Sequence, residues 1–223
     1  MSSSALARLY WKLESWIVPG LRSSQNVYAE VLYSTVTPST RWLDLGCGHQ
    51  VFPDWIDQNS IVRRAAMVVG IDPDAGSIKH HKAIRNRVVG LDLPFAAGSF
   101  DLITANMVFE HLENPAAVLA DLRRVLAPGG KLIFHTVNRR YWKVMVARGI
   151  PQSLKTRLVH WMEGRAEADI YPTHYRINTQ RDIFESGAAA GFHVHDIQFV
   201  NTSSTSRMKL GPFVLVELAL IRL

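Results

Sequence analysis

The sequence predicts a doubly wound α/β sheet with helices on both faces, mostly parallel strands and an antiparallel hairpin at its C-terminal edge. Three observations support this fold. Short apolar runs alternate with helical patterns over residues 41–137. The run at 66–71 is wholly apolar, as a parallel strand covered on both faces requires. Two further strand patterns, at 192–200 and 213–223, follow one another without a helix between them, which indicates antiparallel pairing.

The N-terminal segment, residues 1–38, predicts two helices. The first has apolar side chains at three- and four-residue steps and ends before Pro19; these side chains are Leu6, Leu9, Tyr10, Leu13, Trp16 and Ile17. We expect this face to pack on the protein's own core or to cover a pocket, with a membrane surface as the alternative. The second helix is expected at 24–34, capped by Ser23 or Ser24.

The central elements follow in regular order. After the strand and loop at 41–49, the patterns predict the helices 53–64, 77–84 and 115–126 and the strands 66–71, 87–89, 100–105 and 131–137. The run Pro128-Gly129-Gly130 is expected to end the last of these helices. Residues 139–171 show no strand pattern and are interpreted as an insertion, and a helix at 179–190 with Thr179 as its cap restores the order.

Composition indicates one globular domain over residues 1–223. The chain is 48% hydrophobic, and its net charge of +6 permits an anionic partner without requiring one, because the 25 basic residues are scattered. One cysteine excludes an internal disulfide and fits a reducing compartment. No signal peptide or membrane span is recognisable, so we expect a cytoplasmic protein, a monomer or homodimer, for which peripheral membrane contact stays open.

The stretch at 41–49 is the candidate ligand loop. Gly46 and Gly48 allow a sharp turn after a strand and a close approach of a ligand to the backbone. Asp44 stands at the strand end, where a carboxylate suits a positively charged ligand better than a pyrophosphate. Val51 occupies the place of the third glycine of a dinucleotide fingerprint. Cys47 is expected to be a small buried side chain, not a reactive thiol.

Acidic residues follow three successive strands. Asp72 lies 24 residues beyond Gly48, near the spacing at which a carboxylate accepts hydrogen bonds from a ribose. Asp92 follows the third strand, where it could accept a hydrogen bond from a base amino group. Each of these residues alone could be a solvated turn aspartate. Together with Asp44, they predict a ligand site at the carboxyl ends of the strands.

In combination, six stretches resemble the class I S-adenosylmethionine-dependent methyltransferases, and within them the ubiquinone and menaquinone methyltransferase group. They are Leu-Asp-Leu-Gly-Cys-Gly at 43–48, Gly-Ile-Asp-Pro at 70–73, Leu-Asp-Leu-Pro-Phe at 91–95, Gly-Ser-Phe-Asp-Leu-Ile at 98–103, Phe-Glu-His-Leu-Glu-Asn-Pro at 109–115 and Leu-Ala-Pro-Gly-Gly-Lys-Leu at 126–132. The resemblance implies a Rossmann-like, seven-stranded sheet whose final hairpin is antiparallel. It also implies S-adenosylmethionine as cofactor and S-adenosylhomocysteine as product.

The resemblance assigns expected cofactor contacts. Asp44 would face the methionine amino group, and the turn at 46–48 would lie under the methionine portion. Asp72 and the neighbouring Pro73 would border the ribose. Asp92 and the Leu93 backbone would read the adenine, and Asn106 would border the cofactor. The cofactor's sulfonium and ammonium charges agree with the acids, because carboxylates offset positive charge in a cleft.

Three histidines are candidates for a general base, since histidine titrates in the working range. They are His111, His135 and His174. In some related quinone O-methyltransferases the pair that corresponds to Glu110 and His111 binds a metal together with an earlier glutamate. Met107 stands at that earlier position, so we expect no metal site.

The acceptor side is expected in two regions. The segment around His174, with Tyr175 and Arg176, resembles an element that contributes to the substrate side in the family. The region 139–178, which includes Trp142, is expected to form a lid over the substrate, with an interface or membrane-facing surface as the alternative. By the same analogy, Arg22 and Tyr28 of the N-terminal segment are expected to close over the cofactor.

The sequence therefore predicts a methyltransferase that acts on a small-molecule acceptor, most simply the oxygen of a phenolic, quinonoid or glycan-like compound. Two other readings stay open. The basic pI of 9.7 would suit an RNA or protein methyltransferase, although no appended nucleic-acid module or basic cluster with interleaved aromatics is present. A catalytically inactive cofactor-binding partner protein would also keep the three aspartates.

Overall fold

A computed structural model describes residues 12–90, 92–142, 144–145, 149, 171–202 and 213–222. The chain divides into two compact units. The larger, here called the sheet unit, contains residues 28–147 and 171–197, and the smaller, here called the terminal unit, contains residues 1–27, 148–170 and 198–223. The candidate site residues belong to the sheet unit, with Arg22 as the exception.

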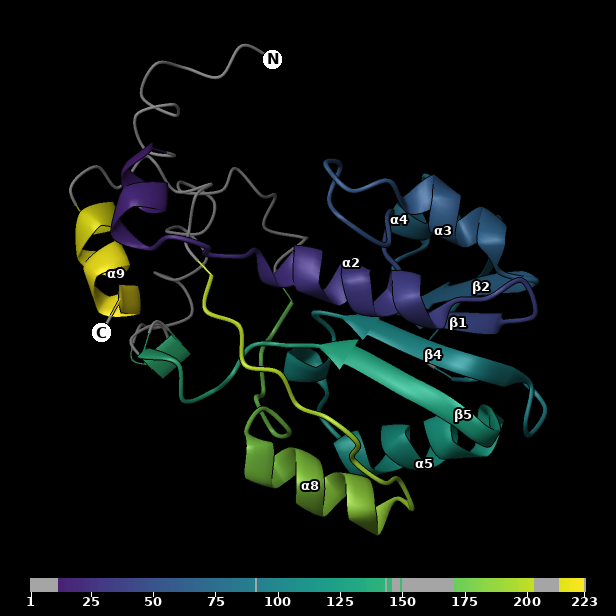
Figure 1. Ribbon diagram of the computed structural model, residues 1–223. Helices are drawn as coiled ribbons and strands as arrows, with labels where there is room; N and C mark the ends of the chain where they lie inside the picture. Colours follow the sequence, from purple (N-terminus) through teal and green to yellow (C-terminus); the bar gives the residue numbers. More distant parts are fainter. Residues whose placement is uncertain are drawn as a thin grey trace. The chain divides into compact units, whose positions relative to one another are not determined.

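The sheet unit is built on five parallel strands in the order β3-β2-β1-β4-β5 (Figure 1). Their bounds are β1 Arg41–Leu45, β2 Met67–Asp72, β3 Asn86–Val89, β4 Phe100–Asn106 and β5 Leu126–His135. Because the order reverses between β1 and β4, the carboxyl ends of these two central strands form the switch point where open α/β sheets bind ligands.

Helices cover both faces of this sheet (Figure 1). One face carries α2 (Ser24–Thr35), α3 (Gln58–Arg64) and α4 (Ala75–Lys79), and the other carries α5 (Pro115–Val125) and α8 (Gln180–Ala189). Trp42 and Leu102 pack in the first core, whereas the adjacent Leu43 and Ile103 pack in the second. The alternation follows from the two-residue period of strands, so β1 and β4 are apolar on both sides.

Several boundaries follow the caps that the sequence offers. The Asp57 side chain accepts hydrogen bonds from two backbone N–H groups, so α3 begins at Gln58 and not at the predicted residue 53. The Thr179 hydroxyl accepts a hydrogen bond from the Asp182 N–H at 3.1 Å and caps α8, as predicted. The run Pro128-Gly129-Gly130 does not end a helix, because α5 ends at Val125 and this run lies inside β5 beside a register shift.

The predicted seven-stranded sheet with an antiparallel C-terminal hairpin is wrong. In the part of the chain that the structure describes, the sheet has five strands and all are parallel. Residues 213–222 form a helix, α9 (Phe213–Arg222). A continuous apolar run does not by itself distinguish a buried strand from a buried helix, and leucine, alanine and glutamate here favour the helix. The predicted strand at 192–200 would have paired with the one at 213–223. Since residues 213–222 form a helix, residues 192–200 lack that neighbour and form no strand in the structure.

The terminal unit brings the two ends of the chain together. Residues 12–17 are helical, and Leu218 of α9 is fully buried against Ile17, Val18 and Leu21. Trp16, predicted on the buried face of the first helix, is instead 76% exposed. The predictions for residues 1–11, for 150–170 and for most of the loop at 201–206 lie outside the described residues. No helix in the described ranges is long and apolar enough to cross a membrane.

Candidate functional site

The site is organised around Asp44, which is 3% exposed near the end of β1. Its Oδ1 accepts a hydrogen bond from the Thr104 hydroxyl at 2.5 Å, and the Trp42 Nε1–H donates to the same Thr104 oxygen at 2.7 Å. Thr104 is the partner of Asp44 in the β1–β4 ladder. Burial raises the pKa of Asp44 to about 7, with the nearby Asp72 adding to the rise and the Thr104 bond opposing it.

Tyr28 of α2 lies close to Asp44. Its ring stacks on His135 at a centroid distance of 5.7 Å and meets Phe52 edge-on at 6.0 Å. Its buried hydroxyl has no hydrogen-bond partner among the described residues. Burial and then the charge of Asp44 raise the pKa of this phenol well above its usual value. A buried carboxyl close to a buried hydroxyl suits a cationic, hydrogen-bonding ligand group.

The glycine turn lies directly after β1. Gly46 and Gly48 have φ angles of +65° and +52°, in the left-handed region that favours glycine. A Cβ on Gly46 would also collide with the Val108 side chain. Cys47 between them is 2% exposed, and burial raises the pKa of its thiol, so it is the inert packing residue that we expected. The turn therefore presents backbone, not side chains, to the site.

Asp72 ties this turn to the end of β2. Its Oδ2 accepts from the Gly48 N–H at 2.8 Å, and its Oδ1 accepts from the Asp74 N–H at 2.9 Å. The side chain is thereby fixed, yet a carboxylate has further lone pairs for a ligand hydroxyl. Beyond it, Pro73 and Asp92 are exposed. Leu93 is 5% exposed, and its carbonyl accepts from the Arg124 guanidinium at 2.9 Å.

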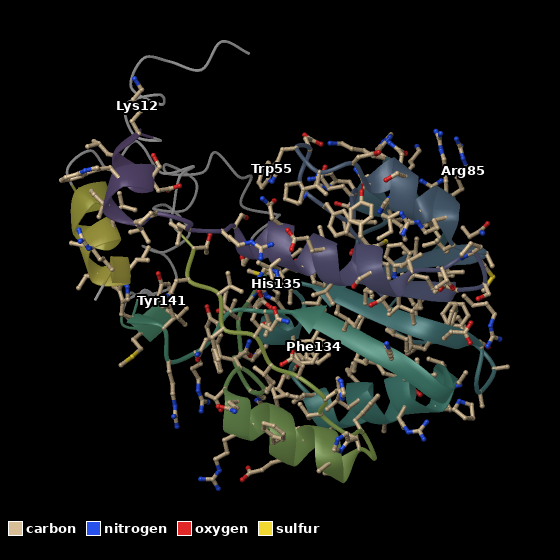
Figure 2. The ribbon with its side chains drawn as sticks, in the orientation of Figure 1. Lys12, Trp55, Arg85, Phe134, His135 and Tyr141 are labelled. Carbon is tan, nitrogen blue, oxygen red and sulfur yellow. The ribbon has the colours of Figure 1, made fainter. Side chains whose placement is uncertain are left out.

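His135 stands where β5 ends beside α2 (Figure 2). Asn106 holds it, because the amide Nδ2 donates to the Val51 carbonyl at 3.2 Å and leaves Oδ1 facing the imidazole Nδ1 at 2.9 Å. With this arrangement the ring is the tautomer protonated at Nδ1. Burial lowers the pKa of His135 to about 4, so the ring is neutral at pH 7.

A second polar cluster, which sequence reasoning left out of the candidate site, centres on Glu110. This side chain is 3% exposed and accepts a hydrogen bond from the Thr136 hydroxyl at 2.7 Å. Asn178 Nδ2 donates to Thr136 at 2.7 Å and to the Val137 carbonyl at 3.0 Å. Burial raises the pKa of Glu110, while the Thr136 bond opposes the rise. The motif that contains His111 could have pointed to Glu110 as a site residue. Nothing in the sequence indicated that Thr136, Asn178 or Thr104 would lie in the site.

The backbone of Glu110 holds the segment around His174 that the sequence analysis expected on the acceptor side. The Glu110 carbonyl accepts from the backbone N–H groups of His174 at 2.8 Å and Tyr175 at 3.1 Å. Tyr175 has a φ of +52°, an unusual value for a residue with a side chain. His174 and Arg176 are exposed, and Trp142 is 38% exposed.

His111 is held in a different way from His135. Its Nδ1 lies 2.7 Å from the Pro172 carbonyl, so Nδ1 is the donor and the neutral ring keeps a lone pair on Nε2. Tyr171 meets the ring edge-on at 6.1 Å. In the described ranges, no group of three or more His, Cys, Asp or Glu side chains could hold a metal ion. Met107, which the sequence analysis placed at the third position of such a metal site, is 37% exposed.

Comparison with known proteins identifies the class to which this fold and site belong. A methyltransferase-domain family model matches residues 25–197, so the chain belongs to that family, among the class I S-adenosylmethionine-dependent methyltransferases. The ubiquinone biosynthesis O-methyltransferase of Hahella chejuensis is 30% identical over 145 residues, which are 60% of this chain and 58% of that protein. The mitochondrial ubiquinone biosynthesis O-methyltransferase of Rattus norvegicus is 37% identical over 110 residues, 44% of this chain and 30% of that protein.

Solved structures agree on the fold. An S-adenosylmethionine-dependent methyltransferase from Mesorhizobium loti has a TM-score of 0.56 at 20% identity, covering 85% of this chain and 91% of that chain. A mycolic acid cyclopropane synthase, solved with S-adenosylhomocysteine, has a TM-score of 0.54 at 21% identity, covering 78% and 63%. The chain spans less than two thirds of the length of the first curated relatives it matches.

The burial of Asp44 generates a stability prediction. Its folded pKa of about 7 lies above its value in an unfolded chain, so ionisation of Asp44 costs the fold stability as pH rises from about 4 to about 7. Asp44→Asn removes this cost and should raise the free energy of unfolding at pH 8, by at most about 4 kcal/mol for three pKa units. The gain should shrink as pH approaches 4. Urea unfolding at both pH values measures it, and a variant that is less stable than wild type at pH 8 would contradict the burial argument.

Proposed function

We propose that this chain transfers a methyl group from S-adenosylmethionine to a hydroxyl oxygen of a small phenolic, quinonoid or glycan-like acceptor. The observation that carries the proposal is the buried Asp44 carboxyl, with the buried Tyr28 hydroxyl close to it, at the switch point of the sheet. The names of the curated relatives, ubiquinone biosynthesis O-methyltransferases, support oxygen as the target atom.

The residues present fit the cofactor. The Asp44 carboxylate would receive the ammonium group, and the backbone of Gly46, Cys47 and Gly48 would lie under the methionine portion, with open space where a Cβ on Gly48 would stand. Asp72, fixed by two backbone amides and followed by Pro73, would accept the ribose hydroxyls. Asp92 and Leu93 would border the adenine, and Asn106 the methionine side. When bound, the cofactor supplies a methyl group on a sulfonium whose displacement leaves a neutral thioether.

His111, in preference to His135 and His174, would be the general base that takes the proton from the acceptor hydroxyl. A general base works best when its pKa lies near the working pH, and His135, with a pKa of about 4, is a weak base. His135 would instead act as a neutral wall of the site beside Tyr28. His174 is exposed, so with Tyr175, Arg176 and Trp142 it would contact the acceptor's outer part. His111 keeps a lone pair on Nε2 and is anchored through Nδ1.

Cofactor binding is the first test. Saturating S-adenosylhomocysteine should raise the melting temperature of the wild-type protein, because it binds the folded state. Asp72→Ala should reduce that rise, since it removes the proposed ribose acceptor. Asp196→Asn, an exposed carboxylate outside the proposed site, is the matched control and should leave the rise unchanged. An unshifted wild-type melting temperature would reject the cofactor proposal.

The pH dependence of binding tests Asp44 itself. Below pH 7 this carboxyl is protonated in the free protein, and an ammonium ligand prefers the carboxylate. The affinity for S-adenosylhomocysteine should therefore rise with pH, up to about tenfold per unit, and level off above about pH 7. Calorimetry in buffers of different ionisation enthalpy should detect proton release near pH 6. Asp44→Asn should bind weakly with a flat profile, and an equally steep profile in this variant would assign the proton elsewhere.

Methyl transfer tests the base. With a labelled methyl donor and a panel of catechols and phenols, His111→Gln should lower kcat by about 10² to 10⁴, the usual contribution of a general base. The loss should be smaller for acceptors of low pKa, which ionise without help. His135→Asn should change KM more than it changes kcat. Equal losses in the two variants for every acceptor would contradict this division of roles.

A further inference from the structure

The helix at residues 12–17 buries its acid and exposes its tryptophan. Glu14 is 8% exposed, whereas Trp16 is 76% exposed. Lys12, four residues before Trp16, is exposed as well and therefore shares its face of the helix (Figure 2). The exposure of Trp16 is unfavourable in water, because burial benefits an indole. This face, which carries an indole and an ammonium group, suits a boundary between an apolar and an aqueous phase.

The terminal unit has other exposed apolar side chains. Phe199 is 62% exposed and Leu220 of α9 is 45% exposed. An open hollow of about 590 Å³ is lined by residues of the N-terminal and C-terminal segments, among them Arg22, Phe199 and Ile221. In this hollow an aromatic and an aliphatic side chain therefore accompany a basic side chain.

The basic excess of the chain is concentrated in the same unit. The segments 1–27, 148–170 and 198–223 contain ten lysine and arginine residues against five aspartate and glutamate residues. The longer sheet unit contains fifteen against fourteen and is nearly neutral. Among the described side chains of the terminal unit, the exposed charges are Lys12, Arg22 and Arg222, all basic, and the acid Glu14 is buried.

We propose that the terminal unit docks on the surface of an anionic lipid membrane. Trp16 and Phe199 would sit at the depth of the headgroups, where aromatic rings are favoured, and Leu220 would reach the acyl boundary. Lys12, Arg22 and Arg222 would meet the negative headgroups, each basic residue near such a surface improving binding about fivefold. The contact would be peripheral and salt-sensitive. This inference is independent of the methyl-transfer reaction.

Charge alone would also attract a nucleic acid. The exposed aliphatic Leu220, however, gains nothing from a phosphate backbone, whereas the indole of Trp16, 76% exposed, is favoured at the boundary of an apolar phase. A membrane accounts for both the charge and the apolar groups, so the observations favour it. Binding to RNA in place of lipid is therefore an outcome that the experiment must detect.

Vesicle co-sedimentation of the full chain tests the proposal. The protein should bind vesicles of phosphatidylcholine with phosphatidylglycerol much more tightly than phosphatidylcholine alone, and about 0.5 M NaCl should weaken that binding strongly because it screens surface charge. Lys12→Gln should lower the partition coefficient about fivefold. Trp16→Ala should lower it by a similar factor through loss of the interfacial ring.

Matched variants in the sheet unit provide the controls. Trp55 is 69% exposed and Arg85 is exposed, so Trp55→Ala and Arg85→Gln remove the same chemistry from the other unit and should leave vesicle binding unchanged (Figure 2). Melting temperature and S-adenosylhomocysteine binding, measured on all four variants, should match wild type. Absence of wild-type vesicle binding, equal losses from Trp16→Ala and Trp55→Ala, or binding to single-stranded RNA but not to vesicles would each overturn the proposal.

Discussion

The hydroxyl of Thr104 is the group on which the candidate site depends. Its oxygen accepts the indole N–H of Trp42, so its own hydrogen is directed to Asp44. All three side chains are at most 3% exposed, and all come from the same face of the adjacent strands β1 and β4. The ladder between these strands therefore fixes both the position of the carboxyl and the direction of the hydrogen bond that it accepts. A buried carboxyl held in this way is costly without a partner, which is the condition that a cationic ligand relieves.

The Thr136 hydroxyl is a second hydrogen-bonding centre, on the proposed acceptor side. Thr136, just after β5, donates to Glu110 and accepts from Asn178. Through this chain of hydrogen bonds the short helix η1 (Phe109–His111) and the segment before α8 are joined to the end of the sheet. In the proposed function the two threonine-centred networks have different roles. The first would present charge to the cofactor, and the second would place residues that meet the acceptor. His135 and Tyr28 stack beside the first network, and His111 belongs to the second.

The core of the fold and the cofactor side were predictable from local pattern. Glycines at the strand end, acids after successive strands and alternating strand and helix patterns all act within a few residues of one another, so β1, β2, β4, α5 and α8 were identified near their observed bounds. The C-terminal hairpin was predicted wrongly because an apolar run of ten residues is compatible with either a strand or a helix. In the structure this run forms α9, whose Leu218 packs on Ile17, Val18 and Leu21. The outward direction of Trp16 was missed for the same reason, since a helical period identifies a face but not what covers it.

The sequence by itself determined the class of this protein, because the cofactor motif is contiguous and its chemistry, small residues for the turn and carboxylates for a cation, is carried by residue type. Only the tertiary structure decided which hydroxyls orient those carboxyls, that Glu110 is buried, and that His135 and His111 have different hydrogen-bond partners. Those properties arise from burial and from hydrogen-bond partners 26 to 61 positions away in the chain. No local pattern records such distant partners, since the sheet alone brings the strand ends together.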